Sequence, residues 1–127
     1  MDCRVVVRVK EVRGRCAMGY EPGGAFVVER FYIRDAGKGV CLHALAAMLT
    51  LLAPLLKGVS ATALGVGKEE GVGYAQCPDP GEPYTCGGTA VFELRREKLP
   101  GPLHVSSCEH NAGTRASSTL SLQYRYS

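Results

Sequence analysis

The fold is decided by residues 40–56, which read VCLHALAAMLTLLAPLL and contain no Asp, Glu, Lys or Arg. Alanine and leucine dominate this segment, and both residue types favour a helix over a strand. Gly58 lies just beyond the segment and supplies a helix stop. The sequence therefore predicts one long apolar helix. We expect a kink at Pro54 or a helix end near Ala53, because proline removes a backbone hydrogen bond from a helix interior.

A helix that is apolar on every side needs to be covered on every side. Its length lies at the lower limit for a membrane span, and His43 and Pro54 interrupt the apolar run. We therefore expect no membrane partner. The helix should pack against a sheet on one face and against another subunit on the other, as a homo-oligomer and most simply a symmetric dimer.

Period-two alternation of apolar and polar residues marks strands on both sides of this helix. The expected strands are residues 3–12, 25–33, 74–77 and 89–97, with a mobile glycine-rich connection over residues 61–73. This order predicts an α+β fold, with a small antiparallel sheet of about four strands in β-β-α-β-β order covered by the helix.

A proline- and glycine-rich stretch after Lys98 marks a domain boundary. Residues 1–98 are predicted to form one compact domain. Residues 99–127 form a C-terminal extension that is partly disordered or adds a peripheral strand, because residues 106–118 lack a pattern and residues 119–126 alternate.

The charge distribution gives little indication of a partner. The formal net charge is only +3, and the charged residues alternate with apolar ones as they do on the wet face of a strand. Weak nucleic-acid binding through the basic strand face of Arg4, Arg8 and Lys10 remains an alternative. A nucleotide fold is disfavoured, because the glycines of residues 65–68 lack the framing of a Walker loop.

The chain opens on a strand pattern without a charged-then-apolar signal segment, so we expect a cytoplasmic, reducing location. In that compartment six cysteines indicate free thiols or metal ligands before disulfides. Asparagine occurs only at Asn111, and such scarcity is typical of thermophile proteins. An intrachain disulfide therefore stays open, because hyperthermophile cytosols tolerate them.

Three cysteines lie where a strand or helix should meet a turn, namely Cys16, Cys41 and Cys77. Cys41 opens the predicted helix, where free N–H groups and the positive end of the helix dipole stabilise a thiolate. It is therefore the best candidate for a nucleophilic or redox thiol, with Asp79 or His43 as proton acceptor. The alternative is that Cys41 is a small buried residue that fills helix–sheet packing.

The same three cysteines are candidate ligands for a zinc or iron ion. Zinc binds four Cys, His or carboxylate ligands in a tetrahedron. The fourth ligand would come from His43, Asp79 or Cys86. Cys3 lies on the apolar face of the first strand and is expected in the core.

Five motifs occur in a fixed order: Arg15-Cys16-Ala17-Met18-Gly19, Phe26-Val27-Val28, Gly39-Val40-Cys41-Leu42-His43-Ala44-Leu45, Gln76-Cys77-Pro78-Asp79-Pro80 and Val91-Phe92-Glu93-Leu94-Arg95-Arg96. The set resembles a family of small uncharacterised prokaryotic single-domain proteins with a Cys-x-x-Gly, Gly-x-Cys-x-x-Ala and Cys-Pro-Asp pattern. The resemblance implies a compact domain in which the second cysteine opens an apolar helix, and it implies no activity. Many members have His in place of Tyr20, so no role that needs an imidazole there is expected.

The residues thus predict a small protein with a cysteine-centred thiol or metal site, and Cys41 is the residue expected to carry any catalysis. Hydrolase chemistry has no anchor, because neither a Ser-His-Asp arrangement nor paired carboxylates occur. The alternative is a non-catalytic oligomeric binding module, with a small-molecule or protein ligand, whose cysteines are structural.

Overall fold

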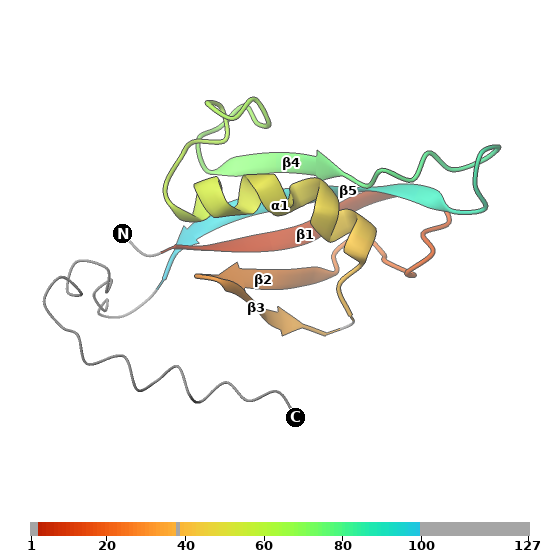
Figure 1. The fold of residues 1–127 in the computed structure, drawn as a ribbon, viewed down its shortest axis with the longest axis horizontal. Helices are drawn as coiled ribbons and strands as arrows, with labels where there is room; N and C mark the ends of the chain where they lie inside the picture. The colour runs from red at the N-terminus through yellow and green to blue at the C-terminus, as the bar shows by residue number, and fades with distance from the viewer. Residues whose placement is uncertain (1–2, 38, 100–127) are drawn as a thin grey trace, which may run out of the picture.

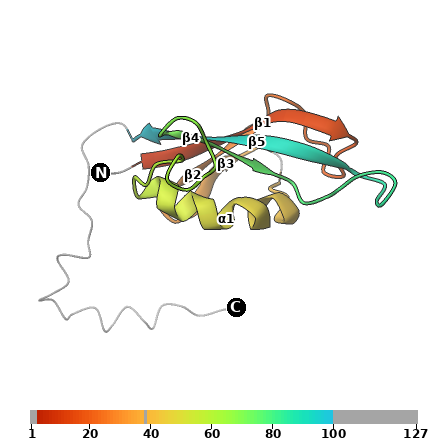
Figure 2. The same cartoon turned by 90° about the horizontal axis from the view of Figure 1, so that it is seen from above.

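The computed structural model describes residues 3–37 and 39–99 (Figure 1). Along the chain these form β1 (Cys3–Gly14), β2 (Ala25–Glu29), β3 (Tyr32–Ala36), α1 (Leu42–Leu56), β4 (Val72–Gln76) and β5 (Gly88–Lys98). The strands make one antiparallel sheet in the order β3-β2-β1-β5-β4. Figure 2 shows α1 lying against one face of this sheet. The predicted extension of residues 99–127 lies outside the described residues except for Leu99.

The α+β class is confirmed, and the strand count and order need a correction. Residues 25–33 were expected to be one strand, but the chain folds into a hairpin in which β2 ends at Glu29 and β3 begins at Tyr32. Arg30 makes the turn with a φ of 53°, in the left-handed region. No Gly, Pro or Asn marks this turn, so the sequence pattern concealed it. The described sheet has five strands in β-β-β-α-β-β order.

The core lies between α1 and the two central strands. β1 and β5 pair from Cys3↔Lys98 to Gly14↔Gly88, which is the longest pairing in the sheet. The helix-facing side of β1 is buried from Cys3 to Val9, and Cys3 is in the core as expected. The largest fully buried side chains are Phe92, Met48, Leu55, Leu94, Val5 and Val7. Every second side chain along these strands is therefore buried, and these side chains pack against one side of the helix.

The helix begins two residues after the start of the predicted segment 40–56 and ends with it at Leu56. It begins at Leu42 and continues through Pro54 to Leu56, so the expected end near Ala53 is wrong. The carbonyl group that Pro54 leaves without a donor belongs to Thr50, an exposed residue that water can reach. At the C-terminal end, the Arg96 guanidinium of β5 donates to the carbonyl oxygens of Leu55 (3.3 Å) and Val59 (2.7 Å). This side chain fastens the end of the helix to the sheet.

No helix in the described part of the chain is long and apolar enough to cross a membrane.

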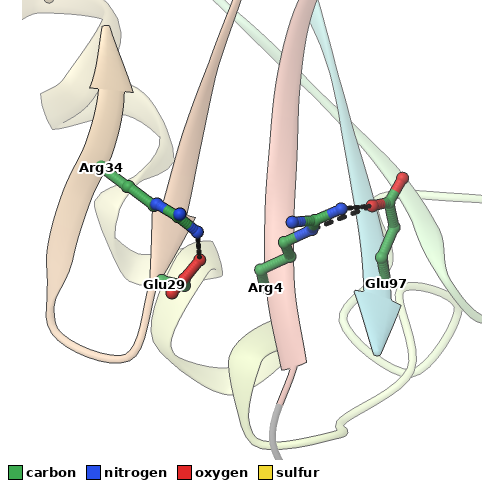
Figure 3. Close-up of polar contacts among 4 residues, drawn as sticks. All are labelled: Arg4, Glu29, Arg34 and Glu97. Carbon is green, nitrogen blue, oxygen red and sulfur yellow. Dashed lines mark hydrogen bonds and ion pairs between the residues drawn. The ribbon is translucent and has the colours of Figure 1, made fainter. Parts of the chain in front are cut away.

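The face of the sheet opposite α1 carries charged residues. Arg34 binds Glu29 at 2.8 Å, and Arg4 of β1 binds Glu97 of β5 at 2.9 Å (Figure 3). These four side chains alternate in sign across the sheet, because Arg4 is paired in register with both Glu29 and Glu97.

A mobile connection was expected over residues 61–73. Residues 61–71 form a compact loop, and residues 72–73 already belong to β4. Backbone hydrogen bonds join Ala61 N–H to the Glu70 carbonyl oxygen (2.7 Å) and Tyr74 N–H to that of Val66 (2.8 Å). Gly67 lies so close to Val72 that a Cβ there would be 2.0 Å from the Val72 carbonyl oxygen. The glycines of this loop therefore permit close backbone packing.

Replacing Leu55 with Ala should lower the free energy of unfolding by about 2–5 kcal/mol, because the side chain is fully buried and the surroundings cannot close the cavity. Urea denaturation followed by circular dichroism measures this change. Thr50→Ala, on the exposed side of the same helix, should change stability by less than about 0.5 kcal/mol. Equal effects of both variants would contradict the observed packing of α1.

Candidate functional site

The three predicted cysteine segments converge at one end of the molecule, on the right in Figures 1 and 2. Cys16 lies in the loop after β1, Cys41 directly precedes α1, and Cys77 directly follows β4. Antiparallel pairing explains this arrangement, since β1 and β4 both run toward the end of the sheet at which β5 begins.

Tyr20 joins two of these segments and was not among the predicted site residues. Its hydroxyl accepts a hydrogen bond from the Cys41 backbone N–H (2.8 Å) and donates to the Gly39 carbonyl oxygen (3.2 Å). Its ring stands edge-on to Phe92, with the ring centroids 5.9 Å apart. Tyr20 therefore anchors the start of α1 to the loop after β1 and to the core.

The electrostatic surroundings of Tyr20 include both nearby thiols. Burial raises the pKa of its hydroxyl, and the charges that Cys41 and Cys16 carry as thiolates raise that pKa further. The hydrogen bond from the Cys41 N–H acts in the opposite direction without cancelling the rise in pKa. The protonated hydroxyl thus persists to higher pH than in an exposed tyrosine.

Cys41 occupies the N-cap position of α1. Its backbone is extended, with φ −66° and ψ 129°, and its carbonyl oxygen accepts the Leu45 N–H at 2.9 Å. The thiol is half-buried and makes no capping hydrogen bond, and the first turn contains no acidic residue. The N–H groups of the first helical turn are therefore left without a side-chain cap from Cys41.

Asp79 is held by its own loop. Its carboxylate accepts hydrogen bonds from the Thr85 hydroxyl (2.5 Å) and the Gly81 N–H (2.9 Å). These two bonds, the Thr85 bond foremost, lower the pKa of Asp79, and the exposed His43 lowers it slightly further by its charge. Two of its acceptor sites are engaged in the loop, so Asp79 serves as a turn-forming residue close to His43.

Cys77 is buried in the hydrophobic core, and its sulfur accepts the Asp79 N–H at 3.4 Å. Cys16 is half-buried and Cys86 is exposed. The described cysteines are all free thiols. Over residues 3–37 and 39–99, no group of three or more His, Cys, Asp or Glu side chains is arranged to hold a metal ion. The geometry thus gives the predicted zinc or iron site at Cys16, Cys41 and Cys77 no support.

A cavity of about 290 Å³ adjoins this end of the molecule. It is bounded mainly by apolar side chains, and Tyr20 forms part of its wall; the other side chains that line it include Val9, Pro22, Phe26 and Phe92. A cavity of this size can take a small ligand or part of a larger one. Neither Cys41 nor Cys16 lines this cavity, and Tyr20 is the residue that connects it to the Cys41 backbone.

Sequence reasoning identified the cysteine segments and missed Tyr20, the residue that connects them. The sequence did contain an indication of Tyr20, because the resemblance marked position 20 as a departure from the histidine of many members. Comparisons with protein-family models, with curated proteins and with solved structures each found no match. The resemblance stated above therefore stays a prediction.

Tyr20→Phe should change how stability depends on pH. Folding raises the pKa of Tyr20, so the protonated hydroxyl stabilises the folded state. This stabilisation is fully present below the unfolded pKa of about 10 and is lost as pH rises through the folded pKa. The variant should lack this loss and should be about 1 kcal/mol less stable at neutral pH, since two backbone groups lose their partner.

Denaturation midpoints measured from pH 8 to above about 10 would show both effects. Tyr84→Phe is the matched control, because the Tyr84 side chain is 80% exposed. Identical pH profiles for the wild-type protein and Tyr20→Phe would contradict the assigned role of Tyr20.

Proposed function

We propose that this protein acts through a thiol site centred on Cys41, with Cys16 as the neighbouring thiol and Tyr20 as the residue that positions Cys41. The observation that carries the proposal is the state of the α1 N-terminus. Cys41 is the N-cap residue, yet its sulfur is not engaged in capping. The uncapped N–H groups and the positive end of the helix dipole can stabilise negative charge that develops on this sulfur during a reaction.

The surroundings support a site that receives a small molecule. Tyr20 lines the cavity of about 290 Å³, and its hydroxyl accepts a hydrogen bond from the Cys41 backbone N–H, so the cavity adjoins the residue that positions Cys41. The reaction class is nucleophilic attack, in which a sulfur lone pair forms the new bond and the leaving group departs with the displaced electron pair. Tyr20 is a positioning residue in this scheme. Asp79 and His43 remain candidates for the proton acceptor, and His43 is the less restrained of the two because Asp79 is held by its loop.

The proposal includes a cytoplasmic location, because free thiols persist where the medium is reducing. It also includes membership of the small prokaryotic family described above, on the residues quoted there. A zinc or iron ion is not part of it, since the described side chains offer no ligand set.

A non-catalytic oligomeric binding module is the second candidate, and two observations favour it. Cys77 and Cys3 are buried in the core, as structural cysteines are. The outer face of α1 is uncharged and exposed.

Nucleic-acid binding through the basic strand face is less favoured, because Arg4 binds Glu97 and Lys10 lies 3.7 Å from Glu93. Carboxylates interleave with the cations there and reduce the positive field.

Alkylation mapped by mass spectrometry tests the thiol proposal. At neutral pH, Cys41 should react with iodoacetamide faster than the exposed Cys86, although Cys41 is half-buried. Cys77 should be protected in the folded protein. A Cys41 rate below that of Cys86 would identify it as a packing residue and favour the binding module.

Elemental analysis tests the metal alternative. Protein purified without added metal should contain far less than one zinc or iron per chain, because the described cysteines do not form a ligand set. A stoichiometric content that is lost in Cys41→Ser would restore the metal site and displace the thiol proposal.

A further inference from the structure

The exposed face of α1 carries an apolar stripe that the core does not use. Its members are Leu42, Ala46, Leu49 and Ala53, hereafter the seam residues, and all four are exposed. Leu42 is 79% exposed and Leu49 is 56% exposed. In Figure 2, α1 forms the outer layer, and no described segment lies over its far side.

The spacing of the seam residues is that of a helix–helix contact. Successive members are separated by four, three and four positions, the 4-3 repeat that keeps residues on one side of a helix facing a partner helix. The stripe contains no charged residue, and none occurs anywhere in residues 39–56. An exposed helix of a protein that works as a monomer would carry charges here.

The order of large and small residues along the stripe points to the partner. Large and small alternate as Leu, Ala, Leu, Ala. If a second copy packs antiparallel about a two-fold axis between Ala46 and Leu49, then Leu42 faces the partner's Ala53 and Ala46 faces the partner's Leu49. Every leucine then meets an alanine, so the stripe is complementary to itself. We infer that α1 pairs with α1 of a second copy in this register.

The adjoining groove extends the same surface. About 390 Å³ of open space lies between α1 and the β2–β3 hairpin, bounded by Leu49, Ala53 and Ile33 among other side chains. Phe31, 90% exposed at the hairpin turn, lies beside the C-terminal end of α1, with Lys57 Nζ 5.8 Å from its ring centroid. Antiparallel packing brings the N-terminal end of the partner helix to this place. Phe31 is thus positioned to cover the partner's Leu42, the most exposed seam residue.

The α1–α1 pairing gives the predicted homo-oligomer a contact surface and a residue-by-residue alignment, and it does not depend on the thiol site. The pairing also accounts for an uncharged helix face that no segment among residues 3–37 and 39–99 covers.

Sedimentation of the full chain across about 1–100 µM, the range that brackets a micromolar dissociation constant, tests the pairing. The wild-type protein should sediment at twice the chain mass of 13.5 kDa. Ala46→Glu and Leu49→Lys should each give a monomer, with the dissociation constant raised at least about 100-fold, because each dimer would bury two unpaired charges. Gln76→Lys is the control and should stay dimeric, because Gln76 is exposed on β4 and pairs with Val91 on the face of the sheet turned away from α1.

The register has its own test. An equal mixture of Ala46→Glu and Leu49→Lys should recover the dimer, because the carboxylate introduced at position 46 then faces the ammonium introduced at position 49 of the other chain. Circular dichroism checks that each variant is folded, and Leu49→Ala, which should weaken the dimer mildly, replaces any variant that is not. A monomeric wild-type protein, a dimer that survives both single variants, or a mixture that stays monomeric would overturn the inference.

Discussion

The burial of one stripe of α1 against the central strands is the contact on which the structure depends. Met48 and Leu55 of the helix are fully buried, as are Val5 of β1 and Leu94 of β5. No other helix covers the sheet in the described part of the chain, and the loop before β4 completes the cover with Ala61, Leu64 and Val66. The hydrophobic effect acts here mainly through the contact between α1 and the sheet.

That contact also places the candidate site. Because α1 lies along the sheet, its N-terminus reaches the end at which β1 turns and β4 ends. Cys41 therefore lies beside Tyr20, whose ring contacts Phe92. At the opposite end, Arg96 binds the Leu55 and Val59 carbonyl oxygens and prevents the helix from sliding along the sheet. The position of the thiol is thus a consequence of packing that begins far from it.

Much of this arrangement was predictable from residue patterns, and the failures have specific physical causes. Alternation in residues 3–12 and 89–97 identified the central strands, and the Ala- and Leu-rich segment identified the helix. The β2–β3 hairpin was missed because Arg30 adopts a left-handed backbone that its residue type does not indicate. Tyr20 was missed because its two hydrogen bonds join groups 19 and 21 positions away, a relation that no local pattern contains. The burial of Cys77 in the core likewise depends on tertiary packing, which the local sequence pattern does not contain.

The alternating charges on the uncovered face have a consequence for folding accuracy. Arg4 stands opposite Glu97, and Arg8 stands opposite Glu93, in the pairing of β1 with β5. A shift of one residue would turn the valines of β1 toward water, and a shift of two would set Arg4 against Arg95. Both mispaired arrangements are penalised, the first by exposure of apolar surface and the second by repulsion between like charges. The charged face of the sheet thereby favours one register between β1 and β5, the two longest strands, as the sheet forms.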